Sequence, residues 1–394
     1  MFVFWPLVLL GLWKLTDPRH LGHYAVFTTA ARRFWNGQSA YGSDFGGGVG
    51  FYFYSPSCAM FLFRPFASLP DQVGAVLYMG LSVLVFVWGA KLWFARLKVD
   101  RKRFDTFLVL VAPAMYAALL ASKVELLMVG MVFCALATAR SRPVVAGVVL
   151  GILVNWKFQP IPTALLMSLA LYLTDRKLVA LRFFSGVVAG FVGFSVLPLV
   201  FLERLFLLSE MQLWRESLSG FVAESYFHFD TIYKFLYQNF DWIVPYGWTR
   251  IFAVVLGALL ALLLYGRFRP VTDHQTPQRQ NAALVLAAAF GGFFTVLASP
   301  LHQNNALIHL AYGAVWIVLL YGGDFWRGHW SRQKVTVVAL WGFIALAYSD
   351  LMGKTLRFWF VDHALKPVAV LVLLTVVAVI EFQNARKTGE LQLR

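Results

Sequence analysis

The chain has 394 residues, of which 60% are hydrophobic and 13% are charged, and its formal net charge is +15. A soluble protein of this length needs far more charge to cover its surface, so the composition excludes a soluble domain. The Lys and Arg residues are scattered through short loops between apolar segments, which indicates a multi-pass membrane protein and argues against a nucleic-acid partner.

Apolar segments long enough to be helices recur along the whole chain. A spanning helix needs roughly 20 apolar residues, and several of the segments are shorter than this. The pairs 106–139 and 144–174 are therefore expected to form hairpins that only partly cross the membrane. The first segment lacks a basic start and a small-residue cleavage site, so we interpret it as a helix rather than a removable signal. We expect a single transmembrane domain over residues 1–394 with about twelve helices. The segments are 2–15, 73–95, 106–121, 124–139, 144–157, 160–174, 181–202, 248–266, 281–299, 303–321, 335–352 and 366–382.

The distribution of basic residues predicts the orientation. If every segment crosses, the loops richest in Lys and Arg fall on one side together with both termini, and this side should be cytoplasmic. The chain has no Asn-x-Ser/Thr site, which favours a bacterial source and hence the bacterial cytoplasmic membrane. The basic stretches are 96–103, 140–142, 175–177, 267–279, 327–334 and the tail from 386.

Two long segments are then predicted to face outward, 16–72 and 203–247. The first contains a helical stretch from Tyr24 to Trp35 that ends at Asn36-Gly37, with its apolar residues on one face. Such a helix should lie flat on the membrane surface. The aromatic-rich stretch from Phe221 to Phe240 predicts a second interfacial helix.

Ionisable residues at the edge of an apolar bundle are costly, so each is a hypothesis for a functional site. Lys157 lies between two apolar runs, where Pro160 and Pro162 break the helix and can open a cavity. A lysine there can hold a phosphate as a point charge. The alternative is a lysine whose side chain only reaches the membrane surface from a helix end.

Two further polar groups are predicted at outer turns. Lys123 and Glu125 lie at the tip of a hairpin, where they form either a substrate-binding pair or an exposed turn. His302 and Asn304 follow Ser299-Pro300 and can donate and accept hydrogen bonds, as sugar hydroxyls require. The alternative there is a polar connector.

The first outer segment contains the candidates for a general base. Asp17, His23 and Asp44 could each take a proton from a hydroxyl acceptor, although each one alone could be a solvated loop residue. Tyr54 and Arg64 follow in the same segment and add aromatic and cationic surface.

Other chemistries have no support in the sequence. There is no Walker loop, dinucleotide fingerprint or zinc-protease helix motif. Cys58 and Cys134 lie far apart in apolar surroundings, so we predict no disulfide framework, no metal site and no cofactor.

Short motifs distributed over both halves of the chain resemble those of glycosyltransferase family 87, which belongs to the C-type glycosyltransferase superfamily of multi-spanning enzymes. The similarity lies in their order and spacing as well as in their residues. The motifs are Ala30-Ala-Arg-Arg-Phe-Trp-Asn-Gly37, Tyr41, Phe53-Tyr-Ser-Pro56, Arg64-Pro-Phe-Ala-Ser-Leu-Pro70, Lys157 with Pro160, and Ser299-Pro300 with His302.

The resemblance implies a C-type glycosyltransferase-like bundle and a reaction. A polyprenyl-phosphate sugar, usually mannose, donates its sugar on the outer side of the membrane to a glycolipid or glycan hydroxyl, with inversion at the anomeric carbon. Cations stabilise the phosphate leaving group, so a metal is not obligatory. Membrane lipids surround the prenyl tail of the donor.

The expected roles follow from the same resemblance. Lys157, with Lys123 or Arg64, would contact the phosphate, and His302 and Asn304 would contact the sugar or phosphate.

The expected base departs from the family pattern. The family usually has an Asp a few residues before Ala-Ala-Arg, and here His23 occupies that place. The base is therefore Asp17 with a shifted alignment, or His23, since imidazole can serve near neutral pH; Asp44 is the third candidate.

A rival hypothesis is a flippase or transporter of lipid-linked glycans, or a non-catalytic binder of such lipids. Transporters commonly carry internal repeats with a site near the membrane midplane. No repeat is visible here, and the polar residues gather near the outer ends of the segments. The sequence therefore favours the enzyme.

Overall fold

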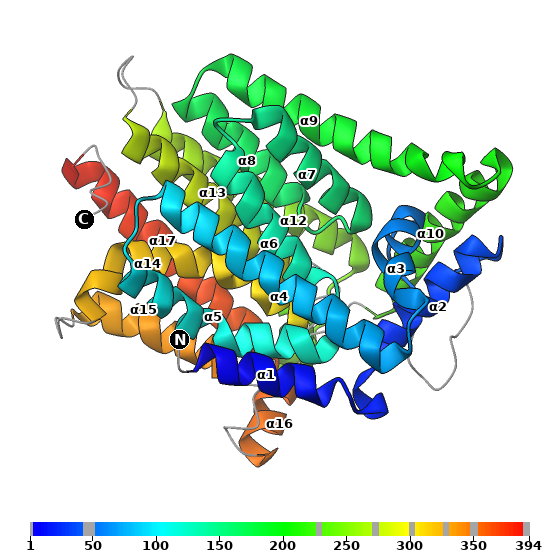
Figure 1. The fold of residues 1–394 in the computed structure, drawn as a ribbon. Helices are drawn as coiled ribbons and strands as arrows, with labels where there is room; N and C mark the ends of the chain where they lie inside the picture. The colour runs from blue at the N-terminus through cyan, green and yellow to red at the C-terminus, as the bar shows by residue number, and fades with distance from the viewer. Residues whose placement is uncertain are drawn as a thin grey trace.

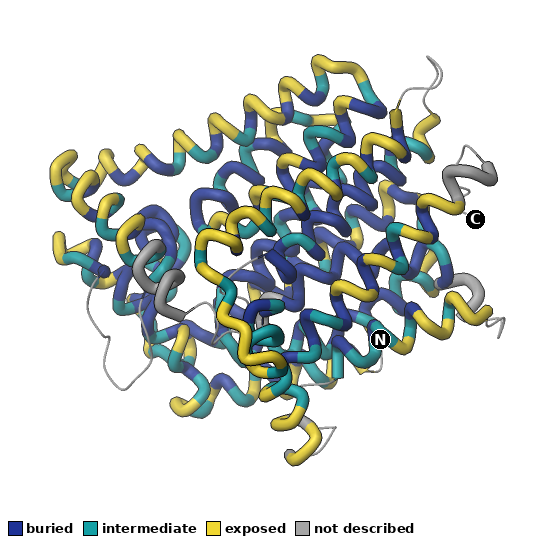
Figure 2. The backbone as a smooth tube through the Cα atoms, turned by 180° about the vertical axis from the view of Figure 1, so that it is seen from behind, coloured by how far each residue is buried: buried dark blue, intermediate teal, exposed yellow. Residues whose placement is uncertain are grey.

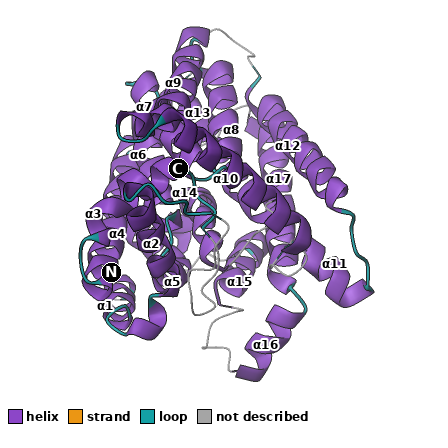
Figure 3. Ribbon diagram, turned by 90° about the vertical axis from the view of Figure 1, so that its right-hand side faces the viewer, coloured by secondary structure: helices purple, strands orange, loops and turns teal. Residues whose placement is uncertain are grey.

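The computed structural model describes residues 3–41, 52–225, 231–269, 276–298, 304–325, 331–346 and 354–388. Within these ranges every regular element is helical, and Figure 3 shows the helices packed into one bundle without a strand among the residues drawn in colour. This confirms the prediction of an all-α protein.

Figure 1 shows how the helices follow one another along the chain. The α-helices are α1 (Phe4–Lys14), α2 (Gly22–Trp35), α3 (Arg64–Ala67), α4 (Asp71–Arg96), α5 (Arg101–Ala121), α6 (Glu125–Thr138), α7 (Pro143–Trp156), α8 (Ile161–Thr174), α9 (Lys177–Val196), α10 (Arg204–Ser225), α11 (Ile232–Phe240), α12 (Tyr246–Phe268), α13 (Pro277–Ala298), α14 (Ala311–Phe325), α15 (Arg332–Leu346), α16 (Lys354–Asp362) and α17 (Leu365–Thr388). Short 3₁₀ helices form η1 (Pro18–His20), η3 (Leu197–Val200) and η5 (Asn304–Leu310), and a π-helix forms η2 (Cys58–Phe63).

Each predicted apolar segment coincides with a helix over its described residues. Within the described part of the chain, 6 helices are long and apolar enough to cross a membrane: α4, α5, α9 with η3, α12, α13 and most of α17. Others are shorter; α6, α7 and α8 have 14 residues each. At 1.5 Å per residue such a helix is about 21 Å long, which is less than a hydrocarbon layer of about 30 Å. The structure therefore shows a multi-pass architecture, and the number of twelve crossings stays a prediction.

Burial separates a central helix from peripheral ones. The apolar window of α13 is 89% buried, whereas the corresponding windows of α9 and α12 are only 22% and 28% buried. Large apolar side chains on these outer helices, such as Leu181 and Val254, are largely exposed. Figure 2 shows the same pattern, with buried backbone inside the bundle and exposed stretches along its outer helices. Exposed apolar helix faces of this extent fit a lipid environment and not water.

Helices α7 and α9 pack at very close range through glycines. Gly147 and Gly151 on α7 face Gly186 and Gly190 on α9, and a Cβ atom added to any of them would collide with a backbone carbonyl of the opposite helix. Both pairs are spaced four residues apart, so the small residues form one face on each helix. Dispersion contacts between the two backbones then hold the pair together where no hydrophobic effect can act between lipid-exposed helices.

The bundle has two ends that can be told apart by their connections. Arg140 forms an ion pair with Asp175, 3.1 Å from Nε to Oδ2, and Gln280 Nε2 donates to the carbonyl of Thr174, 2.8 Å away. These contacts join three basic loops at one end, which we call the Asp175 end. Thr295 Oγ1 donates to the carbonyl of Gln159 at the other end of α8 and α13. That end, near Lys157, is called the Lys157 end.

The first predicted outer segment includes the expected helix. α2 ends at Trp35, with Asn36 as the cap and Gly37 at φ +66°, a left-handed conformation that glycine adopts without strain. Residues of the second segment form α10 and α11. In Figure 1, α2, α3 and α10 lie together at one extremity of the bundle, and the label of α17 lies toward the opposite one. The position of these helices relative to the membrane surface stays a prediction.

Candidate functional site at the Lys157 end

The centre of the site is an ion pair between Lys157 and Glu125. The Nζ atom of Lys157 lies 2.6 Å from Oε1 of Glu125. The carboxylate is almost completely buried, with a side chain 2% exposed, whereas the lysine side chain keeps 27% of its surface. The ammonium therefore faces a space that a ligand can reach, while the carboxylate holds it from the protein side.

The sequence explains why these two groups meet. Glu125 is the first residue of α6, and Lys157 follows the last residue of α7, so the antiparallel hairpin brings both to one end. A carboxylate is favoured at a helix N-terminus and a cation at a C-terminus. Ser122 adopts a left-handed conformation at φ +50° between α5 and α6, which reverses the chain sharply before Glu125. This conformation costs free energy in a non-glycine residue.

The second oxygen of Glu125 has no hydrogen-bond partner in the part of the chain that the structure describes. Oε2 is buried, and no donor from the described part of the chain reaches it. A buried carboxylate oxygen that stays unsatisfied costs about 1–3 kcal/mol or more. A ligand hydroxyl or amide would remove this cost, so Glu125 is well suited to accept a hydrogen bond from a polar substrate.

Tyr54 forms an aromatic wall beside the lysine. The Nζ atom of Lys157 lies 5.2 Å from the centroid of the Tyr54 ring. The tyrosine backbone is held by Tyr41, whose hydroxyl donates to the carbonyl of Tyr54 at 2.6 Å. Next along the chain, the hydroxyl of Ser55 lies 2.9 Å from Oδ1 of Asn155, close to the end of α7. These contacts fix the described part of the first outer segment against the hairpin that carries Lys157.

His23 and Lys123 complete the cluster of charges. His23, near the start of α2, keeps an exposed surface, yet the protein around it lowers the pKa of its imidazole below the ordinary value of 6.5, and the positive charge of Lys123 lowers it further. Loss of hydration lowers the pKa of the half-buried Lys123 to about 8, although the charge of Glu125 opposes this effect. At neutral pH the cluster thus holds a neutral imidazole beside two ammonium groups and one carboxylate.

His309 belongs to the same region and was not predicted. It lies on η5, is 2% exposed, and its Nε2 atom has no hydrogen-bond partner among the described residues. Its imidazole is within electrostatic range of Glu125 and Lys157. The signal in the sequence was an ionisable residue inside the apolar run 303–321, which is unusual for a membrane segment.

The second outer segment also reaches the site. The backbone N–H of Ala40 donates to Oε2 of Glu210 on α10, 3.4 Å away. Trp214, one turn further along α10, donates from Nε1 to the carbonyl of Phe53 and stacks on Phe158, which follows Lys157. Helix α10 therefore packs along the loop that carries Tyr54.

Other predicted residues have different surroundings. Asp17 caps η1 and pairs with the neighbouring Arg19 at 2.6 Å, and this hydrogen-bonded pair lowers the pKa of the carboxyl to about 2. Arg64 lies on α3, and its Cζ atom is 5.4 Å from the centroid of the Trp35 ring. Asp44 and His302 lie outside the described residues, and Asn304 begins η5. Within the described chain, the structure thus brings Lys157, Glu125, Lys123, His23 and Tyr54 together.

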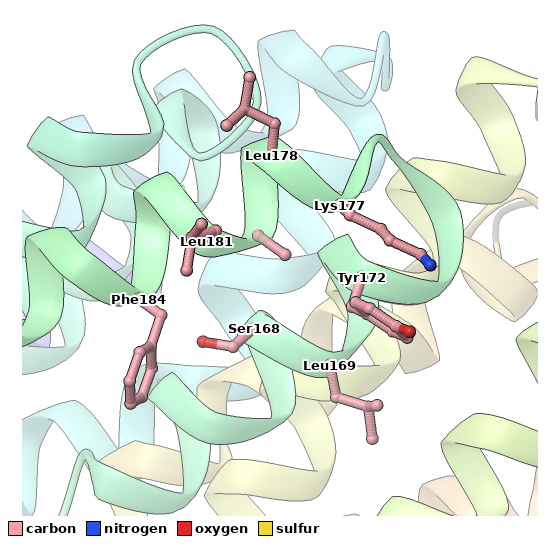
Figure 4. A pocket seen from close by; sticks show the side chains of 8 residues that line it. Ser168, Leu169, Tyr172, Lys177, Leu178, Leu181 and Phe184 are labelled. Atoms are coloured by element: carbon pink, nitrogen blue, oxygen red, sulfur yellow. The ribbon is translucent and has the colours of Figure 1, made fainter.

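An apolar groove on the surface of the described part of the chain lies elsewhere. It has a volume of about 590 Å³ and an almost entirely apolar wall between α8 and α9 (Figure 4). Its polar groups are Ser168, Tyr172 and Lys177, and the Lys177 ammonium lies 5.8 Å from the Tyr172 ring. This groove belongs to the Asp175 end, has no acid–base pair, and is suited to an acyl chain more than to a reaction.

The arrangement at the Lys157 end can bind an anion and a hydroxyl together. Lys157 and Lys123 carry two positive charges against one negative charge on Glu125, so one positive charge of the cluster is left to bind a phosphate. No group of three His, Cys, Asp or Glu side chains in the described part of the chain could hold a metal ion. The cations that the described residues supply to the site are the side chains of Lys157 and Lys123.

Comparison with known protein families matches residues 52–300 to glycosyltransferase family 87. Searches of curated proteins and of solved structures found no significant match. The matched range contains Tyr54, Arg64, Lys123, Glu125 and Lys157, and it begins after His23. Because the match covers more than half of the chain, this protein is a membrane glycosyltransferase that belongs to glycosyltransferase family 87.

Proposed function

We propose that the protein transfers mannose from a polyprenyl-phosphate donor to a glycolipid or glycan hydroxyl on the outer face of a bacterial cytoplasmic membrane, with inversion of the anomeric carbon. The family supports sugar transfer in a membrane. The observation that carries the finer proposal is the partly exposed Lys157, which is held by the buried Glu125 at the edge of an apolar bundle.

The charges of the cluster suit a lipid phosphate. The donor is a phosphodiester with one negative charge, and cleavage of the anomeric carbon–oxygen bond leaves a phosphate monoester with a second. In this proposal Lys157 and Lys123 contact the phosphate, and fixed cations stabilise such a transition state more than the ground state. Tyr54 and α10 form the aromatic surroundings in which the sugar would stack and bind.

His23 is the base that the surroundings favour. The acceptor oxygen attacks the anomeric carbon, its proton passes to the imidazole, and the bonding electrons of the broken bond leave with the phosphate. A base must be unprotonated to act, and the lowered pKa keeps His23 neutral at pH 7. Asp17 is also ionised, but its carboxylate is engaged by Arg19. The open oxygen of Glu125 would accept a hydrogen bond from a sugar hydroxyl.

The test is sugar transfer by the purified full-length protein, with polyprenyl-phosphate-mannose as donor and membrane lipid extract as acceptor source. Wild type is compared with His23→Gln, Asp17→Asn and Asp44→Asn, and each variant is checked for thermal unfolding and donor binding. We expect His23→Gln to lose activity by about 10²–10⁴-fold, the usual contribution of a general base. Asp17→Asn, a matched change in an exposed pair, should keep nearly full activity.

Two results would overturn parts of this proposal. A loss confined to Asp17→Asn or Asp44→Asn would assign the base to that residue. Tight binding of the lipid without any transfer would refute the proposed reaction with this donor and support the rival, a flippase or a non-catalytic binder of lipid-linked sugars. Chemical rescue of His23→Gly by added imidazole would show that the ring acts on the reaction and not only on the fold.

A further inference from the structure

A second buried ion pair lies toward the Asp175 end of the bundle, between α12 and α17. Nε of Arg267 lies 3.3 Å from Oε2 of Glu381, and the two side chains are only 6% and 5% exposed. Trp316 donates from Nε1 to the other oxygen of Glu381 at 2.8 Å. Both oxygens of this carboxylate therefore have a partner.

The arginine of this pair is less well satisfied than the glutamate. Its Nη2 atom is buried and has no hydrogen-bond partner among the described residues. A guanidinium presents its donors in a fixed fork, so a single contact through Nε leaves the other donors aimed elsewhere. A buried donor on a charged group that lacks a partner among the described residues is costly, and the acceptor of a bound ligand would remove this cost.

A cavity of about 310 Å³ lies against this arginine. Its polar lining is Arg267, Arg269 and Glu381, and the remaining walls are apolar. The excess positive charge is increased by Arg279, whose Nη2 donates to the backbone carbonyl of Arg269 at 2.9 Å. The local charge is thus complementary to an anion. The apolar lining residues are Leu262, Leu263, Gly266, Leu286, Phe290, Ala378 and Phe382.

The mouth of the cavity opens on the apolar outer surface of the bundle. Leu262 is 65% exposed and Phe382 is 54% exposed, so two large apolar side chains stand at its edge. Helices α12, α13 and α17, which form the cavity, contact one another in the bundle. A free anion would gain nothing from this apolar edge, whereas the chain of an amphiphile would pack along it.

We propose that this cavity is a binding site for an anionic phospholipid, with the phosphate diester on Arg267 and Arg269 and an acyl chain along Leu262 and Phe382. Arginine matches phosphate geometry better than lysine because its planar fork donates two parallel hydrogen bonds. The basic loops at the Asp175 end predict a cytoplasmic location, where anionic lipids gather and basic pockets between helices bind their headgroups. This site is distinct from the cluster around Lys157 and does not depend on the proposed reaction.

The test uses the full-length protein in phosphatidylcholine nanodiscs, to which phosphatidylglycerol is added in steps while thermal unfolding and retained lipid are measured. Phosphatidylglycerol should stabilise the wild type and be retained over phosphatidylcholine. Arg269→Gln, on the exposed side of the cavity, should weaken this preference about fivefold. The matched control is Arg182→Gln, which removes an exposed charge from α9 and should have no such effect.

Arg267 is tested by the double variant Arg267→Met with Glu381→Met, because a buried pair can be replaced by apolar residues without loss of fold. It should fold and lose the preference for phosphatidylglycerol altogether. Equal retention of the two lipids by the wild type, or equal effects of Arg269→Gln and Arg182→Gln, would overturn the proposal. Stabilisation by inorganic phosphate that phosphatidylglycerol does not exceed would also overturn it, since the site would then bind a free anion.

Discussion

Glu125 and Glu381 are both buried glutamates paired with a basic residue, yet they differ in what remains unsatisfied. At Glu381 both oxygens have donors, from Arg267 and Trp316. At Glu125 only one oxygen has a donor among the described residues, and its lysine partner keeps 27% of its side-chain surface. The open group is an acceptor at the Lys157 end, and at Arg267 it is a donor.

This comparison shows that two buried ion pairs of the same chemical kind can serve different purposes. A carboxylate with both oxygens satisfied holds helices α12, α14 and α17 in register, and it leaves only the arginine with a donor to offer. A carboxylate with one open oxygen, beside an accessible ammonium, can take both a hydroxyl and an anion. The pair of Glu381 with Arg267 is therefore expected to affect stability, and the pair of Glu125 with Lys157 is expected to affect catalysis.

The largest expected effect is on stability, at Glu381. Replacing this residue by Ala leaves the guanidinium of Arg267 buried without its counter-ion, and removing one partner of a buried pair costs about 3–5 kcal/mol. Thermal unfolding in detergent measures the change. The control is Asp175→Ala, which breaks the more exposed pair with Arg140 and should cost about 1 kcal/mol or less. Equal costs for the two variants would contradict the assignment of a stabilising role to Glu381.

The next effect is on activity, at Lys157. Lys157→Met removes the cation and should lower sugar transfer by about 10²–10³-fold, since one charged contact to the developing phosphate is lost. Lys157→Met also leaves Glu125 buried without its ion-pair partner. The unfolding temperatures of this variant and of the double variant Lys157→Met with Glu125→Gln are therefore compared with that of the wild type. Arg64→Met serves as a control, because this cation lies against Trp35. A variant that folds and transfers sugar at the wild-type rate would remove Lys157 from the mechanism.

The smallest effect is on the pH dependence of transfer. His23 acts as a base only when neutral, so activity should rise with pH through a midpoint below 6.5, and it should fall again near pH 8 as Lys123 loses its proton. Lys123→Gln removes a positive charge that disfavours imidazolium, so the rising limb should move to higher pH and the falling limb should disappear. The measurement is kcat/KM between pH 5 and 9. A rising limb at or above pH 6.5 in the wild type would contradict this environment for His23.

Protonation of His23 also makes the stability of the folded protein depend on pH. The folded protein binds this proton more weakly than the unfolded chain does, since the folded pKa is lowered. The contribution of His23 to stability is therefore present above pH 6.5 and is lost as the pH falls towards the folded pKa.

Much of the fold could be predicted because hydropathy is a local property. A run of apolar residues forms a helix wherever the backbone must satisfy its own hydrogen bonds, so the segments 73–95 and 248–266 correspond to α4 and α12. The packing of α7 on α9 was not predicted, because four glycines become a contact face only when two helices are placed opposite each other.

The candidate site was predictable only in its parts. Lys157, Lys123 and Glu125 stood out because ionisable residues are rare at the ends of apolar segments, yet nothing local pairs residue 157 with residue 125. Asp17 was an equal candidate for the base until its ion pair with Arg19 was visible. His309 was overlooked, because a lone histidine in an apolar run carries no sign of its neighbours.

Composition and hydropathy are sums over neighbouring residues, so they were enough to identify a helical membrane protein with its polar chemistry at the ends of apolar segments. The sequence also carried the motifs that match glycosyltransferase family 87. Three features could be seen only once the helices were packed: which charges meet, which carboxylate oxygen lacks a donor among the described residues, and which guanidinium lines a cavity. These depend on atoms far apart in the chain coming within a few ångströms, and helix packing alone sets such distances.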